Sequence, residues 1–146
     1  MVLSWLAKRL VDWVFARLRA GDIRPVIALY APDVRMRFPG RNSWSGEFRG
    51  KQELRAWLER FARVGIQIYA DEVVAAGPPW NATLSIRGHD YVRSPRGETV
   101  YENRYVLWAR LRWGRIYEEE TYEDTEKPLV LDTWLVQNEP HLALAT

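Results

Sequence analysis

The second half of the chain constrains the fold most, because it consists of long strand-like segments separated by tight turns. Three clusters of turn residues interrupt the stretch between Ile66 and Asp124. They are Gly77-Pro78-Pro79, Ser94-Pro95-Arg96-Gly97 and Trp113-Gly114. Glycine and proline favour turns, and the segments between them alternate apolar and polar residues as half-buried strands do. We therefore predict four strands, over residues 66–76, 82–93, 99–112 and 115–124, joined as an antiparallel meander.

The first 65 residues carry helical spacing instead. Residues 3–19 have apolar side chains three and four positions apart, which predicts an amphipathic helix that ends at Ala20-Gly21. A shorter helix follows Asp22 and ends before Pro32, and a third covers residues 54–64. Residues 34–38 alternate as a strand, and residues 39–50 form a loop around Trp44. Helices followed by a meander indicate an α+β fold.

Composition excludes several classes of function. The 146 residues suit one domain, and 47% are hydrophobic, enough for a core. The chain has no cysteine, which excludes disulfides, thiolate catalysis and cysteine-ligated zinc. Its two histidines lie far apart, so we expect no metal site, and no motif indicates a cofactor. The net charge is +2 with scattered arginines, and no apolar run suits a signal peptide or membrane span. We expect a cytoplasmic protein that binds neither nucleic acid nor membrane.

Four short motifs occur in the order found in one superfamily. The chain carries Leu-Arg-Ala-Gly-Asp at 18–22, Leu-Tyr-Ala-Pro-Asp-Val at 29–34 and Gly-Lys-Gln-Glu-Leu at 50–54. The fourth motif is Gly-Arg-Ile at 114–116 followed by Tyr-Glu-Asp-Thr at 122–125. Over residues 5–125 this pattern resembles the SnoaL-like, or nuclear transport factor 2-like, superfamily and its polyketide-cyclase-like branch.

The resemblance implies an architecture. A curved antiparallel sheet would wrap around the N-terminal helices and form a cone-shaped barrel with an internal pocket. The domain would span residues 1–125. The tail, residues 126–146, would pack back on it, with its last residues frayed.

The catalytic patterns of the superfamily match this chain unevenly. Where ketosteroid isomerases keep a carboxylate and a tyrosine, the chain has Phe38 and Val14. Where limonene epoxide hydrolases hold a water, it has Met36 and Phe38, and their last-strand aspartate falls at Thr121. Their middle-strand aspartate matches Asp90. The resemblance therefore favours neither reaction. It leaves the polyketide-cyclase requirement, an inward carboxylate in an apolar chamber.

Strand alternation predicts which side chains point inward. Asp90 shares the apolar face of its strand, and Asn103 and Tyr105 share the apolar face of the next. In the last strand the family register places four residues inward: Tyr117, Glu119, Thr121 and Glu123. The same register places five residues outward: Ile116, Glu118, Glu120, Tyr122 and Asp124.

Asp90 and Asn103 are the candidate catalytic residues. Apolar surroundings raise the pKa of a carboxyl, and nearby Glu119 or Glu123 would raise that of Asp90 further, which suits acid–base catalysis. Asn103 could donate a hydrogen bond to a developing enolate oxygen. The alternatives are that Asp90 pairs with an arginine and that Asn103 only satisfies backbone groups. His89 faces outward, where a solvated or ion-paired histidine is expected.

Side chains expected to face the pocket, most of them aromatic or acidic, are the candidate substrate-binding residues. They are Met36, Phe38, Trp44, Trp57, Trp80, Tyr105, Glu119, Thr121 and Glu123. Trp44 and Trp80 lie in loops expected at the cone mouth, where they would contact a flat apolar ligand. For Trp57 the alternative is ordinary core packing at helical spacing.

Two hypotheses follow for the function. The first is a small cofactor-free enzyme, a cyclase, isomerase or dehydratase, that transfers a proton on an apolar carbonyl compound. The second is a non-catalytic module that binds a small apolar ligand or dimerises. The resemblance also implies a homodimer through the outer sheet face, where Val106, Trp108 and Tyr122 would lie.

Overall fold

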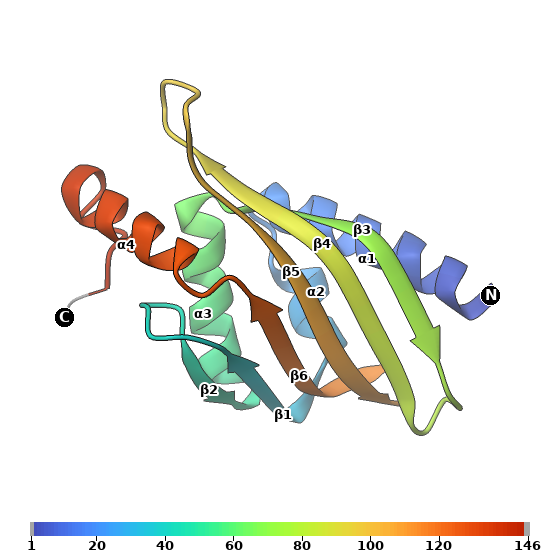
Figure 1. Ribbon diagram of the computed structural model, residues 1–146. Coiled ribbons are helices and arrows are strands. Elements are labelled where there is room, and N and C mark those ends of the chain that lie inside the picture. The colour runs from blue at the N-terminus through green and yellow to red at the C-terminus, as the bar shows by residue number, and fades with distance from the viewer. Residues whose placement is uncertain (1, 145–146) are drawn as a thin grey trace.

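A curved six-stranded sheet with helices on its concave side makes up the computed structural model, which describes residues 2–144 (Figure 1). The elements in chain order are α1 (Val2–Arg19), α2 (Arg24–Leu29), β1 (Tyr30–Phe38), β2 (Gly46–Arg49), α3 (Gly50–Val64), β3 (Gln67–Ala76), β4 (Ala82–Arg93), β5 (Thr99–Arg112), β6 (Arg115–Glu123) and α4 (Lys127–Asn138). The α+β class, the three N-terminal helices and the four-strand meander are as predicted.

The sheet is neither closed nor wholly antiparallel. Its strand order is β2-β1-β6-β5-β4-β3, so β2 and β3 are its two edges. The strand β1 pairs with β6 in parallel, whereas every other pairing is antiparallel. Parallel neighbours need a long connection, and the segment from β2 through the meander supplies it. The predicted α+β fold, a curved sheet around helices, is confirmed, with two differences: the sheet is not closed, and β1 pairs with β6 in parallel.

The strand β1 is longer than predicted, and the following loop contains a short strand. The strand β1 begins at Tyr30, a residue that we expected in the second helix. Within the predicted loop 39–50, β2 forms a hairpin with β1, and Phe38 lies opposite Gly46. The N-cap residue of α2 is Ile23 rather than Asp22, although the Asp22 Oδ1 accepts a hydrogen bond from the Arg24 backbone N–H.

Helix α1 buries a different face from the one its apolar stripe suggests. Its buried residues are Val11, Val14, Phe15 and Leu18. Four other stripe members are exposed, namely Leu3, Leu6, Leu10 and Trp13. A helix that is apolar on nearly all sides does not reveal from its spacing which side faces the core.

A β-bulge in β6 changes which side chains point inward. Arg110 of β5 lies opposite Glu118 and Leu111 opposite Ile116, so Tyr117 is an extra residue in β6. An extra residue reverses the alternation on one side of the bulge. Ile116 is therefore buried and faces inward, whereas the Tyr117 ring lies beside the Arg112 guanidinium, 4.3 Å from its centroid. The predicted orientations of these two residues are wrong.

The tail forms the helix α4, which packs against the body. Leu131 and Leu135 are each 1% exposed. Asp132 accepts hydrogen bonds from the backbone N–H and hydroxyl of Ser43, at 2.8 and 2.5 Å. The predicted fraying of the last residues concerns 145 and 146, which lie outside the described residues. Within residues 2–144 no helix is both long enough and apolar enough to span a bilayer.

Candidate functional site

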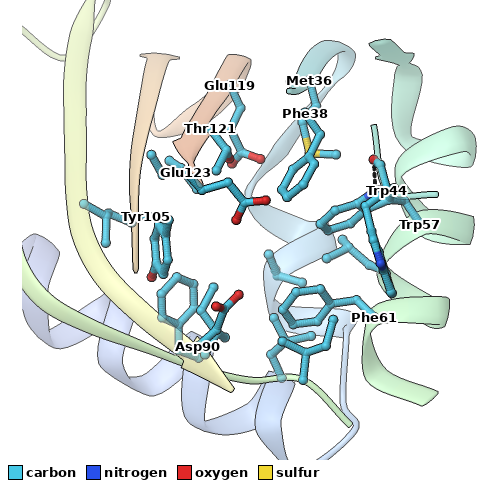
Figure 2. A pocket seen from close by; sticks show the side chains of 18 of the residues that line it. Met36, Phe38, Trp44, Trp57, Phe61, Asp90, Tyr105, Glu119, Thr121 and Glu123 are labelled. Carbon is cyan, nitrogen blue, oxygen red and sulfur yellow. Dashed lines mark hydrogen bonds between the residues drawn. The ribbon is translucent and has the colours of Figure 1, made fainter. Parts of the chain in front are cut away.

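An internal cavity of about 110 Å³ lies between the concave face of the sheet and the helices. Most of its wall is aliphatic or aromatic. The polar residues that line it are Tyr30, Asp90, Tyr101, Tyr105, Glu119, Thr121 and Glu123. Figure 2 shows the carboxyl groups of Asp90, Glu119 and Glu123 pointing into a space faced by Phe38 and Phe61.

All but two of the predicted site residues line this cavity. Those that do are Met36, Phe38, Trp44, Trp57, Asp90, Tyr105, Glu119, Thr121 and Glu123. They come from β1, the β1–β2 loop, α3, β4, β5 and β6, so the fold brings together residues that are distant in the sequence. Asn103 and Trp80 are not part of the lining.

The side chain of Asn103 is occupied by backbone groups. It is buried, its Nδ2 donates to the Asp124 carbonyl at 2.9 Å, and its Oδ1 accepts from the Arg104 N–H at 2.9 Å. The side-chain amide of Asn103, which we expected to donate a hydrogen bond to an enolate oxygen, is therefore already bonded to the backbone. The structure thus gives Asn103 the alternative role that the sequence left open.

The two loop tryptophans do not form a mouth. Trp80 is 59% exposed in the β3–β4 turn, where its ring lies 6.1 Å from that of Trp113. Trp44 is 3% exposed and forms part of the inner wall, with its carbonyl accepting a hydrogen bond from the Trp57 Nε1 at 3.1 Å. Its loop is held inward because the neighbouring Ser43 is bonded to Asp132.

Asp90 is buried without the arginine partner that was its alternative role. The residue is 7% exposed, and its Oδ1 has no hydrogen-bond partner. No arginine within residues 2–144 forms an ion pair with it. Burial raises the pKa of Asp90 to about 7, although the Tyr101 hydroxyl and His89 oppose the shift. His89 itself faces outward, with its Nδ1 2.9 Å from Asp71.

Two more carboxyls share the cavity with Asp90. Burial, together with the charges of Asp90 and Asp124, raises the pKa of Glu123 to about 8, and the Glu123 Oε1 has no partner within residues 2–144 either. Glu119 is fully enclosed, and burial raises its pKa to about 7. The Tyr30 hydroxyl opposes that shift by donating to the Glu119 carboxylate at 3.0 and 3.1 Å.

The arrangement can hold and exchange protons near neutral pH. Three carboxyls face an apolar space, and the lining contains no lysine, arginine or histidine. Burial raises the pKa of Tyr101 and of Tyr105, so both keep their protons, and the Tyr105 hydroxyl donates to the Tyr69 carbonyl at 2.9 Å. Such a site favours neutral ligands and disfavours anions, because a second negative charge in an apolar cavity is costly.

Sequence reasoning missed two polar members of the lining. Tyr101 lies two residues before Asn103, so the same alternation that selected Asn103 indicates an inward Tyr101. Tyr30 was assigned to a helix, and nothing in the sequence pairs it with Glu119, from which 89 positions separate it.

Comparisons with known proteins agree with this fold. The SnoaL-like domain model matches residues 11–119. An NTF2-like protein of unknown function from Burkholderia pseudomallei is 22% identical, with a TM-score of 0.66, covering 81% of this chain and 90% of its own. TerC, co-crystallized with polyporic acid, is 21% identical with a TM-score of 0.66. The match covers 89% of this chain and 97% of TerC. A proposed polyketide cyclase from Sinorhizobium meliloti is 19% identical with a TM-score of 0.56. The match covers 78% of this chain and 94% of the cyclase.

At these identities the structural neighbours support the fold alone. No curated protein matches the chain significantly. The domain model, however, covers most of the chain, including α3, the meander and the first part of β6. The chain therefore belongs to the SnoaL-like domain family.

Proposed function

We propose that this protein is a cofactor-independent enzyme that transfers a proton on a small, neutral, apolar carbonyl compound. The observation that carries the proposal is Asp90, whose buried Oδ1 faces the cavity without a partner. Buried polar groups in folded proteins are nearly always bonded. A carboxyl oxygen left unbonded beside a pocket therefore calls for a ligand, even though the Tyr101 hydroxyl contacts the same carboxyl.

The pKa values of two carboxyls suit complementary roles. Near neutral pH Asp90, with a pKa of about 7, gives up its proton more readily than Glu123, with a pKa of about 8. The Asp90 carboxylate would remove a proton from the carbon next to the carbonyl. The electron pair of that C–H bond would form a carbon–carbon double bond, and the π pair of the carbonyl would move to its oxygen. The Glu123 carboxylic acid would donate a hydrogen bond to the resulting enolate oxygen, the role first expected of Asn103. Returning the proton to another carbon completes an isomerisation.

The cavity limits the ligand. Apolar cavities of about 150 Å³ bind benzene, so a cavity of about 110 Å³ suits a ligand near the size of one ring. Among the structural neighbours, one was co-crystallized with polyporic acid and another is a proposed polyketide cyclase, which supports a small-molecule ligand. The carboxyl-rich lining supports a neutral rather than an acidic ligand for this chain.

A non-catalytic ligand-binding module is the second candidate. Met36 and Phe38 line the cavity at positions where epoxide hydrolases of this superfamily keep polar groups, and Phe38 also replaces the isomerase carboxylate. This apolar wall favours binding over epoxide hydrolysis. The two remaining candidates differ in whether Asp90 exchanges a proton with the ligand.

Hydrogen–deuterium exchange tests the proposal without knowledge of the natural substrate. Cyclohexanone and 2-cyclohexenone are incubated with the protein in deuterated buffer at neutral pH, and NMR follows loss of the protons next to the carbonyl. The wild type should accelerate exchange, and Asp90→Asn should lose about 100-fold or more of that acceleration. Glu102→Gln, an exposed carboxyl of β5, should leave it unchanged.

Ligand-observed NMR and thermal melting complete the experiment. Asp90→Asn should bind the ketones and melt at or above the wild-type temperature, because asparagine has the same shape as aspartate and carries no charge to bury. Equal exchange by Asp90→Asn and the wild type would refute the assignment of Asp90. Binding without exchange by either protein would favour the non-catalytic module.

A further inference from the structure

Helix α1 presents an apolar face to solvent along most of its length. Six large side chains on this face are exposed: Val2 (73%), Leu3 (46%), Trp5 (58%), Leu6 (53%), Leu10 (47%) and Trp13 (55%). The opposite side of the same helix packs against β3 and the core. We call these six residues the α1 outer face. Clusters of this kind on a protein surface mark interaction sites, whereas scattered single residues do not.

The segment that carries this face is basic overall, although Lys8 and Arg17 are paired with Asp12 and Asp22. Residues 2–24 contain five basic side chains (Lys8, Arg9, Arg17, Arg19 and Arg24) and two acidic ones (Asp12 and Asp22), a net charge of +3. The whole chain carries +2, so the remaining residues together carry −1. The basic excess of the protein is therefore concentrated in the segment that carries the α1 outer face.

In place of the expectation from net charge and hydropathy that the chain binds no membrane, we propose that the α1 outer face docks on a lipid surface with anionic headgroups, with the helix lying parallel to that surface. Leucine, valine and tryptophan side chains would enter the boundary between headgroups and acyl chains, as in interfacial helices. Arg9 and Arg17, which lie beside this face at helical spacing, would meet the lipid phosphates.

The arrangement of tryptophan and arginine on α1 suits the boundary between lipid headgroups and acyl chains. Trp5 and Trp13 are eight residues apart, or about 12 Å along the helix at about 1.5 Å per residue. Tryptophan is enriched at membrane interfaces because its ring is apolar and its N–H is polar. The Arg9 guanidinium lies over the Trp5 ring, 5.2 Å from its centroid, and its flexible side chain can follow the headgroups.

Charge decides between a lipid surface and a second copy of this chain. Pairing two α1 outer faces would bring two segments of charge +3 together, and like charges disfavour that contact. An anionic surface compensates the same charges. The lipid surface is therefore the occupant to which the proposal commits.

Flotation with vesicles tests the inference on the full chain. Phosphatidylcholine vesicles with and without phosphatidylglycerol are mixed with the protein, and the bound fraction is measured. We expect binding to the phosphatidylglycerol vesicles that weakens as salt is added. The double variant Leu6→Gln, Trp13→Gln should weaken it by about 100-fold or more, and Arg9→Gln by about fivefold.

Matched variants separate this face from general stickiness. Val130 and Val136 of α4 are 60% and 59% exposed, so Val130→Gln, Val136→Gln removes comparable exposed side chains elsewhere and should bind like the wild type. Circular dichroism checks that each variant folds, and Arg9→Gln carries the test if the double variant does not. Failure of the wild type to bind, or equal binding to both vesicle types, would overturn the proposal. So would a dimer in sedimentation that the double variant abolishes without any effect on vesicles.

Discussion

At the scale of single residues, the defining feature is a group of acidic side chains buried in an apolar cavity without cationic partners. Asp90, Glu119 and Glu123 line one apolar cavity. Within residues 2–144 the Tyr30 hydroxyl donates to Glu119 and the Tyr101 hydroxyl contacts Asp90, but Asp90 Oδ1 and Glu123 Oε1 have no hydrogen-bond partner. Acids in such surroundings hold protons to a higher pH than they do in water. The folded protein therefore carries a cost in stability that a purely apolar cavity would not have.

This cost makes stability depend on pH in a defined direction. The pKa of Asp90 is raised from 3.8 to about 7 on folding, so between these values the folded state binds more protons than the unfolded state. The free energy of unfolding should therefore fall as pH rises through this window, and the loss from Asp90 between pH 5 and pH 8 should be about 2–3 kcal/mol. Asp90→Asn removes that contribution and should flatten the slope, leaving the variant more stable than the wild type at pH 8.

Urea unfolding at pH 5 and pH 8 measures both quantities. Glu102→Gln serves as the matched control, since Glu102 is exposed on the adjacent strand. A variant Asp90→Asn that lost as much stability between the two pH values as the wild type would show that Asp90 is not the titrating group.

The sequence was informative about which residues face inward but not about what they bond. Alternation alone placed Asp90 and Tyr105 on the concave face, because β4 and β5 keep their pairing register without a break along residues 82–92. The partner of Asn103 is the backbone carbonyl of Asp124, which no residue pattern records. Trp80 was misplaced because a turn residue can point to either side of the sheet.

At the scale of elements, two predictions failed because residue spacing does not record how elements pack: the inward side of β6 and the buried side of α1. The bulge at Tyr117 depends on how β5 and β6 pair, not on the sequence of β6 alone. The buried side of α1 depends on which of two apolar sides meets β3. Long strands and turn clusters were predictable because both strand formation and turn formation depend on neighbouring residues.

The helix α4 should contribute strongly to stability through one side. Leu131 is 1% exposed and lines the cavity, whereas its neighbour Val130 is 60% exposed. Leu131→Ala should cost about 2–5 kcal/mol of unfolding free energy, since a cavity remains where the side chain was. Val130→Ala should change it by less than about 0.5 kcal/mol.

Chemical denaturation of the two variants distinguishes these outcomes. Similar small losses for both would mean that α4 is only loosely attached to the body. In that case the wall of the cavity formed by Leu131 would be open in solution.

At the scale of the whole molecule, we propose a homodimer through the outer face of the sheet. Val106, Trp108 and Tyr122 are 38%, 46% and 55% exposed on neighbouring strands of that face. Val106 and Tyr122 lie directly opposite each other in the β5–β6 ladder. Apolar and aromatic side chains gathered in this way resemble the centre of a protein–protein interface.

Sedimentation equilibrium tests the dimer. The wild type should sediment as a dimer, and Trp108→Glu should sediment as a monomer because a buried carboxylate at the interface lacks a partner. Leu129→Glu, at a similarly exposed position of α4 (43%), should remain dimeric. A monomeric wild type would remove this proposal without affecting the assignment of Asp90.

The parallel pairing of β1 with β6 has a consequence for how the chain reaches its native state. During synthesis β1 and β2 emerge early, but the strand that joins them to the meander is the last of the six. Contacts so distant in sequence form slowly, because a long loop must close before they are gained. Until β6 arrives, the N-terminal helices lack the wall that the Glu119 side of the cavity provides. In a nascent chain that ends before β6, the β1–β2 hairpin should therefore remain unpaired with the other strands. Chaperones should bind such a chain until β6 is complete.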